Sequence, residues 1–174
     1  LFIPFPVGRL YTLIFRILCN RKMNESKRKF NKTRIKLPET STPSGSYESV
    51  NIEEIYHIAI QFPILNNEFK YQECLENEIS TEEGYKAMEL CALNVLAQVD
   101  EKKIQNIVRL NHIDAYFQSG EDWDDSPIIV NGASELFVKV LGDKGKHSKD
   151  IFGVEKLPRN FSVGLTVSFT IVSK

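Results

Sequence analysis

The sequence lacks paired cysteines, a membrane-length apolar run and an excess of either charge. Its 174 residues include only three cysteines, Cys19, Cys74 and Cys91. An odd number without a Cys-x-x-Cys pair provides no disulfide framework and no zinc or redox pair, so we expect a reducing compartment. The apolar run that comes closest to a membrane span, residues 10–18, contains Arg16 and is too short, so no membrane partner is expected. The formal net charge is −1, which does not by itself attract polyanions.

Familiar catalytic and metal-binding motifs are missing as well. The sequence contains no His-Glu-x-x-His, no Gly-x-Ser-x-Gly and no Gly-x-Gly-x-x-Gly. Residues 142–146 resemble a phosphate-binding loop, but their glycine spacing is too short. His57, His112 and His147 lie far apart in the sequence without ligand spacing, and we interpret each as a surface or structural histidine. The acidic run 121–125 lacks the glycine of a calcium loop and precedes a helix start, where carboxylates are favourable. We therefore expect no metal and no cofactor.

The first 36 residues differ from the rest of the chain. Residues 1–22 contain arginines and no acid, which is typical of an organelle transit peptide. A secretory signal fits less well because arginines interrupt the apolar stretch, and an upstream extension before Met23 is a further reading. Residues 21–36 hold eight basic side chains and one acid, a pattern that can attract phosphates but more often belongs to a solvated, disordered tail. We expect residues 1–36 to be a leader or tail, and a cytoplasmic location, or a mitochondrial or plastid one if residues 1–22 are a transit peptide.

The remaining residues, 37–174, are predicted to form one domain, entered through a Pro- and Ser-rich linker at 38–46. Residues 55–60 have the composition of a strand, and a turn at 66–67 predicts a hairpin that joins this strand to residues 69–71. Ser80 followed by Glu83 forms a capping box, which predicts a helix over 81–99. Its apolar residues recur at steps of three and four and form one face: Met88, Cys91, Ala92, Val95, Leu96 and Val99.

The second half predicts a strand, a helix and a closing strand. Residues 107–117 form the strand, with a bulge near His112 where the alternation changes phase. Ser126-Pro127 fits an N-cap followed by proline at the first helical position, and Gly142 would end this helix. Its inward residues are Ala133, Leu136, Phe137, Val140 and Leu141. Residues 161–171 alternate apolar and polar side chains over a long strand. The element order, ββα-β-α-ββ, predicts an α+β fold with both helices on one sheet face.

Four segments in order resemble the RidA/YjgF family: residues 82–96, 131–136, 145–147 and 153–158. The chain is most similar to the subgroup described as L-PSP endoribonuclease-like with a chorismate-mutase-like fold, over residues 37–172. The resemblance implies a single mixed sheet and a homotrimer with one ligand cleft at each subunit boundary. It also implies imine deaminase chemistry, in which an arginine binds the substrate carboxylate and a glutamate holds the attacking water.

This sequence keeps only part of the residue set that the resemblance implies. Tyr47, Gln61, Pro63 and Asn131 match the family pattern. Lys149 stands at the arginine, Ile60 at a glycine that opens the backbone to ligand, Ile151 at a cysteine, and Thr166 at the glutamate. Lysine lacks the planar fork of arginine, and threonine cannot act as a carboxylate base. The last strand offers no substitute, because residues 162–174 contain no acid. The candidate ligand-binding residues are Lys149, Asn131, Tyr47, Gln61, Ile60, Thr166 and His147. We assign no catalytic residue.

Three functions remain open. The first is a trimer that binds a small carboxylate or carbonyl metabolite between subunits and keeps weak or altered 2-imino acid deaminase activity. It would be a 2-iminobutanoate/2-iminopropanoate deaminase-type hydrolase with a degenerate site. The second is a non-catalytic interaction protein on the same fold. The third is an RNA-directed role, suggested by the family label and the basic run at 21–36. We rank it last because a ribonuclease needs a positioned base or metals, and His147 beside Lys149 is the only candidate pair.

Overall fold

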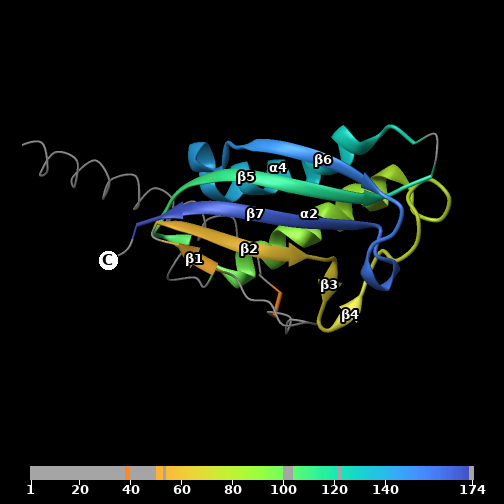
Figure 1. Ribbon diagram of the computed structural model, residues 1–174, viewed down its shortest axis with the longest axis horizontal. Helices are drawn as coiled ribbons and strands as arrows, with labels where there is room; N and C mark the ends of the chain where they lie inside the picture. Colours follow the sequence, from red (N-terminus) through yellow and green to blue (C-terminus); the bar gives the residue numbers. More distant parts are fainter. Residues whose placement is uncertain (1–37, 40–49, 53, 100–103, 121–122, 173–174) are drawn as a thin grey trace, which may run out of the picture.

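The computed structural model describes residues 38–39, 50–52, 54–99, 104–120 and 123–172, so Tyr47 and the predicted leader lie outside the described residues. A mixed five-stranded sheet has the strand order β1-β2-β7-β5-β6, and both long helices lie on one of its faces (Figure 1). The main-sheet strands are β1 (Val50–Ile52), β2 (Ile55–Gln61), β5 (Ile107–Gln118), β6 (Ser148–Val154) and β7 (Val163–Ile171). The helices are α2 (Thr81–Gln98) and α4 (Ser126–Leu141), with short 3₁₀ turns at Gly142–Gly145 and Pro158–Asn160. The predicted α+β fold is confirmed.

Helix α2 begins as its sequence predicts. The Ser80 hydroxyl accepts from the backbone N–H of Glu83, and the Glu83 carboxylate accepts from the backbone N–H of Ser80. Two of the N–H groups that a helix start leaves without partners are thereby satisfied. The predicted apolar face of α2, from Met88 to Val99, is fully buried.

Helix α4 begins one residue earlier than predicted. Asp125 is the N-cap and Ser126 the first helical residue, so the expected Ser126 cap is wrong. Asp125 makes no side-chain capping bond, because its carboxylate instead accepts from the Thr81 hydroxyl at the start of α2, 2.6 Å away. The two helix starts are tied together in this way. Gly142 ends α4 with φ of 65°, a conformation that glycine adopts without steric cost.

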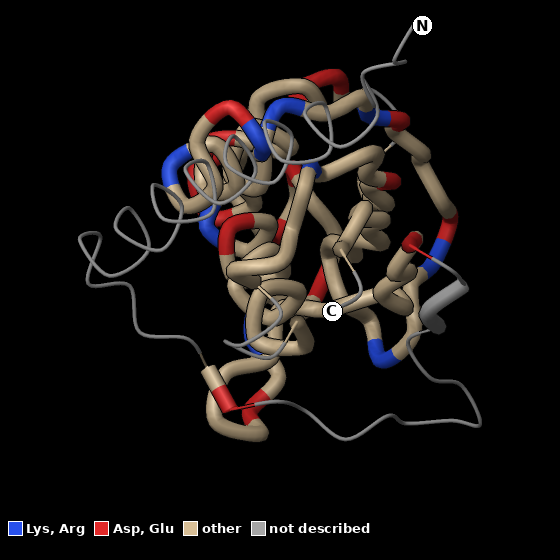
Figure 2. The backbone as a smooth tube through the Cα atoms, turned by 90° about the vertical axis from the view of Figure 1, so that its left-hand side faces the viewer, with Lys and Arg blue, Asp and Glu red and all other residues tan. Residues whose placement is uncertain are grey.

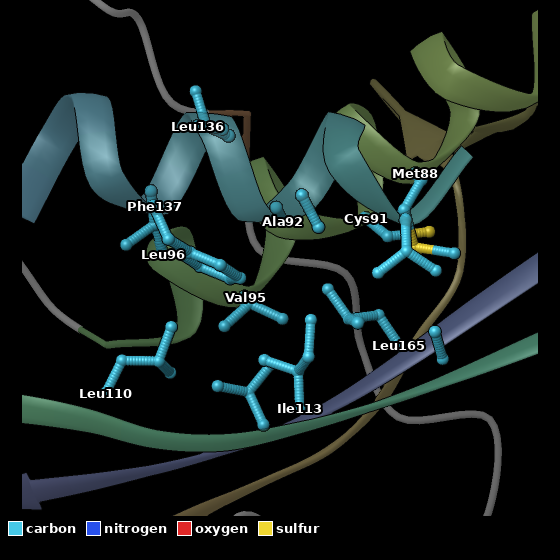
Figure 3. Close-up of a cluster of buried hydrophobic side chains, with 14 of the residues drawn as sticks. Met88, Cys91, Ala92, Val95, Leu96, Leu110, Ile113, Leu136, Phe137 and Leu165 are labelled. Atoms are coloured by element: carbon cyan, nitrogen blue, oxygen red, sulfur yellow. The ribbon is translucent and has the colours of Figure 1, made fainter. Parts of the chain in front are cut away.

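Strand β7 occupies the centre of the sheet, antiparallel to both β2 and β5. Its apolar residues Val163, Leu165, Val167 and Phe169 face the helices and are buried, as the alternation predicts. Figure 3 shows side chains of α2 and α4 meeting those of β5 and β7 in one continuous core. One sheet face is thus filled by helix packing, and the opposite face, called the open face below, has no helix over it among the described residues.

Strand β5 carries the predicted irregularity. Its pairing with β7 shifts register between Leu110 and His112, and a second shift lies between Ile107 and Arg109. Strand β6 then pairs with β5 in parallel, His112 opposite Ser148 and Asp114 opposite Asp150. Paired residues of neighbouring strands share a face, so this register decides which β6 side chains lie on the open face.

The hairpin after β2 forms at the predicted turn but between other residues. Asn66 and Asn67 both have positive φ, 51° and 64°, as a tight two-residue hairpin turn requires. The strands that the turn joins are β3 (Ile64–Leu65) and β4 (Glu68–Phe69), which form a small separate sheet beyond the end of β2 (Figure 1). The expected continuation of residues 55–60 into this hairpin is therefore wrong, and Pro63, which cannot donate to a ladder, marks the break.

Within the described ranges, no helix is long and apolar enough to cross a membrane. Basic and acidic positions are interspersed along the described backbone rather than separated by sign (Figure 2).

Candidate functional site

The turn between α4 and β6 brings a histidine and a lysine against α4. Gly145 allows this approach, because a side-chain carbon at this position would lie 2.4 Å from the carbonyl oxygen of Phe137. The chain therefore returns along α4, and the His147 ring packs edge-on against the Phe137 ring, with centroids 6.1 Å apart. The Gly145-Lys-His147 segment therefore packs the turn against α4, in addition to being a candidate site.

His147 is held by hydrogen bonds at both ring nitrogens. Its Nδ1 lies 2.6 Å from the Gly145 carbonyl oxygen, which can only accept, so Nδ1 carries the proton. Nε2 lies 3.1 Å from the Ser134 hydroxyl, which can donate to it. Burial lowers the pKa of His147, opposed by the bond to Gly145, and the nearby Lys149 charge lowers it further. A neutral imidazole whose lone pair is already engaged is better suited to fix the turn than to act as a general base.

Lys149 and Asn131 meet at the same place. The Lys149 ammonium donates to the Asn131 side-chain oxygen across 3.2 Å, joining β6 to α4. Lys149 is exposed, and no carboxylate of a described residue pairs with it. Asn131 and Ser134 lie one helical turn apart, so Lys149 and His147 contact the same side of α4. The structure therefore brings together three of the seven predicted site residues, as an exposed cation beside an amide and a half-buried imidazole.

Thr166 and Ile60 lie on the other face of the sheet. Thr166 pairs with Asp114 across the open face, and its hydroxyl donates to the Asp114 carboxylate at 2.8 Å. Lys149 pairs with Ile113, the neighbour of Asp114, and so lies on the helix-covered face. Within one chain, the sheet itself separates Thr166 from Lys149.

Ile60 and Gln61, the predicted site residues on β2, both contact neighbouring parts of the sheet. Ile60 packs over Gly164, because a side-chain carbon on Gly164 would lie 2.8 Å from its terminal methyl. A branched side chain thus fills the space that a glycine at this position would leave open. Gln61 is buried, and its amide donates to the carbonyls of Ala59 and Ile60 beside the register shift in the β2–β7 pairing. These local hydrogen bonds assign Gln61 to the irregular segment of β2 at that register shift.

The open face also carries a cluster that the sequence interpretation missed. Ligand atoms of His112, Asp114 and Asp150 all lie within 4.8 Å of one another. The sequence signal is the alternation of His112 and Asp114, which places both side chains on one face of a strand. Asp150 could not be added from sequence, because the parallel register brings it from 36 residues further along the chain. A carboxylate does therefore lie next to Thr166, although the last strand contains none.

Known proteins share this architecture. A family model described as "YjgF/chorismate_mutase-like, putative endoribonuclease" matches residues 27–171. The chain belongs to the YjgF/chorismate mutase-like family. A relative outside the solved structures, protein TCP17 of Trypanosoma cruzi, is 28% identical over 131 residues, which cover 71% of this chain and 80% of TCP17.

Solved structures of other proteins superpose over most of the chain. A "putative endoribonuclease" from Shewanella oneidensis is similar with a TM-score of 0.80 at 23% identity, covering 84% of this chain and 99% of that one. Atu1372 from Agrobacterium tumefaciens has a TM-score of 0.77 at 21% identity, with 90% and 99% covered. TdcF of E. coli with bound serine is more distant, with a TM-score of 0.54 at 13% identity and coverage of 79% and 94%. At these identities the superpositions support the fold alone.

Proposed function

We propose that this YjgF-family chain forms a homotrimer that binds small carboxylate or carbonyl metabolites in clefts between subunits. The supporting observation is the exposed Lys149 ammonium held by Asn131 at the β6–α4 junction. A lysine binds a carboxylate as a point charge, and an amide beside it offers both a donor and an acceptor to the rest of a small ligand. TdcF, a structural neighbour, has a solved structure with bound serine, which bears a carboxylate.

The open face is the surface that we propose for trimer formation. The β7 residues on this face, Gly164, Thr166, Ser168 and Thr170, are small, and two of them bond to β5: Thr166 to Asp114, and Thr170 to Asn111 at 3.0 Å. A helix layer covers only the other face, and single-sheet domains commonly cover the remaining face by assembly. Assembly through the open face would also bring the Thr166 side of one subunit toward the edge strand of another.

Imine hydrolysis by this chain is expected to be slow. Thr166 stands where the family resemblance places the water-holding glutamate, and Ile60 fills the space over Gly164. The nearest carboxylate, Asp114, is already engaged by the Thr166 hydroxyl and the His112 ring. Loss of general acid–base help costs about 10²- to 10⁴-fold in rate.

The binding test compares Lys149→Ala and Lys149→Arg by calorimetric titration with 2-oxobutanoate. Losing a charge-assisted hydrogen bond of about 1.5–3 kcal/mol should weaken binding about 10- to 100-fold. Lys149→Arg should keep or improve affinity, because arginine restores the two-pronged contact. Lys146→Ala is the matched control, since Lys146 is an exposed lysine of the same turn that pairs with Asp143 at 3.0 Å. Equal affinity of the parent and Lys149→Ala proteins would contradict the assignment.

The assembly and the activity have separate tests. Light scattering at micromolar concentration should give the mass of a trimer, and a monomer would refute the inter-subunit cleft.

In a coupled assay, a dehydratase supplies 2-iminobutanoate, and the parent should hydrolyse it far more slowly than a family member with the arginine, glycine and glutamate. Combining Thr166→Glu, Lys149→Arg and Ile60→Gly should recover part of the rate. If the parent is fully active and Asp114→Asn abolishes that activity, the expected slow hydrolysis is wrong. Asp114 would then be the residue that holds the attacking water.

A further inference from the structure

One row of the open face places a histidine between two hydroxyl groups and above two carboxylates. The register aligns His57, Ser168, His112 and Ser148 across four strands, and the next row contains Thr166, Asp114 and Asp150. His112 Nε2 lies 3.0 Å from Asp114 Oδ1 and 3.5 Å from Asp150 Oδ2. These groups belong to two neighbouring strands, so the backbone ladder fixes their spacing.

Ser148 is placed to hold the His112 ring in the orientation that metal binding needs. Its hydroxyl oxygen lies 2.8 Å from His112 Nδ1 and 3.2 Å from the Asn111 carbonyl oxygen. An imidazole that binds an ion through Nε2 carries its proton on Nδ1, where the Ser148 oxygen can accept it. His112 Nε2, Asp114 Oδ1 and Asp150 Oδ2 then offer three ligand atoms that converge on one point.

We propose that His112, Asp114 and Asp150 bind a divalent transition-metal ion, with Zn²⁺ the best match. Tetrahedral zinc with bonds of about 2.0–2.2 Å separates neighbouring ligand atoms by about 3.3–3.6 Å. Of the two distances from His112 Nε2, 3.5 Å falls within that range and 3.0 Å is slightly shorter. One imidazole with two carboxylates favours zinc or a neighbouring transition metal over Ca²⁺ and Mg²⁺, which prefer oxygen ligands alone.

Two side chains next to the proposed ligands, Ser148 and Thr166, form hydrogen bonds that orient them, as is common around metal sites. Ser148 can accept from Nδ1 in the tautomer that directs Nε2 to the ion, and Thr166 donates to the second oxygen of Asp114. Such outer contacts orient ligands and raise metal affinity. In the single chain, the side chains of His112 and Asp114 are about one-third exposed and that of Asp150 is 64% exposed, so the fourth position is open there to a water or a further ligand. This proposal departs from the sequence-based expectation of no metal, and it does not rest on the ligand site around Lys149.

The test titrates Zn²⁺ by calorimetry into the full chain after treatment with a chelator. The parent should bind one high-affinity ion per chain. Asp150→Asn and Asp114→Asn, which keep the side-chain shape, should each weaken binding by at least tenfold. Thr166→Val, which removes only the outer contact, should weaken it about 10- to 100-fold.

His57→Ala is the control, because His57 lies on the same face two strands away, at a distance of about 10 Å. It should leave Zn²⁺ binding unchanged. Equal losses in His57→Ala and Asp150→Asn would show non-specific surface binding and overturn the proposal. Absence of a high-affinity ion in the parent would also overturn it.

Discussion

Replacement of Gly132 by alanine should destabilise the protein by separating α2 from α4. A side-chain carbon at Gly132 would lie 2.3 Å from the Tyr85 carbonyl oxygen and 3.2 Å from the Glu89 nitrogen, both backbone atoms of α2. The first contact is about 1 Å shorter than an ordinary van der Waals separation, and a helix backbone cannot rotate away as a side chain can. Gly132 therefore sets the distance between the two helices that form the upper layer of the core.

Two opposing effects determine the magnitude. Overpacking typically costs about 1–3 kcal/mol, and contact with backbone favours the upper end of that range. Alanine recovers about 1 kcal/mol of helix propensity relative to glycine. The expected net loss is about 2 kcal/mol, or about 4–8 °C in melting temperature for a chain of this size.

The assay is guanidinium unfolding of both proteins at one fixed concentration, because assembly makes apparent stability concentration-dependent. Gly153→Ala is the control, since a side-chain carbon there meets nothing within 4 Å. It should change the unfolding free energy by less than about 0.5 kcal/mol. A Gly132→Ala protein as stable as the parent would refute the inferred close approach of the helices. Because Gly132 follows Asn131, the same variant should also weaken 2-oxobutanoate binding if the Lys149 site is correctly placed.

Three further predictions concern the scaffold. Ser80→Ala removes the capping box of α2 and should cost about 1 kcal/mol in urea unfolding, whereas an unchanged midpoint would mean that the cap is redundant. Asn94→Ala removes two bonds of 2.9 Å from a buried amide to the carbonyls of Phe62 and Ile64. It should cost about 1–3 kcal/mol, and hydrogen exchange should rise in the β3–β4 hairpin, so unaltered exchange there would contradict the link. Because burial lowers the pKa of His147 in the folded state, the unfolded chain binds that proton more readily. The stabilisation that neutral His147 gives the folded state is therefore complete above the ordinary histidine pKa of about 6.5. It is lost as the pH falls through the lower pKa of the folded state. The stability difference between the parent and His147→Gln should narrow on acidification, and a constant difference from pH 7.5 to 5 would exclude this contribution.

Sequence alone predicted the elements whose signal is local. The capping box of α2 and the alternation of β7 depend on residues a few positions apart, and both are confirmed. The cap of α4 was misplaced because Asp125 bonds to Thr81 in the other helix, a contact that no local pattern contains. The hairpin shifted because Pro63 separates it from β2.

The site was harder to predict, because the register between paired strands decides which residues lie together on one face of the sheet. Family resemblance suggested Lys149 and Thr166 as neighbours of one ligand, and a single chain places them on opposite sides of the sheet. A strand shows from its own alternation which residues share a face, but only pairing shows which residues of two strands meet. The His112, Asp114 and Asp150 cluster depends entirely on such a pairing.

The central place of β7 has a consequence for how the chain folds during synthesis. This strand separates β2 from β5, yet it is encoded after both of them and after α4. While β7 is still in the ribosome, β2 has only β1 as a partner, and β5 has only β6. The unit β5–α4–β6 can close early, whereas β2 must wait for residues more than a hundred positions later. During that interval both strands expose unpaired edges that could join another chain, so early contact with a chaperone would benefit this protein more than one whose central strand is made first.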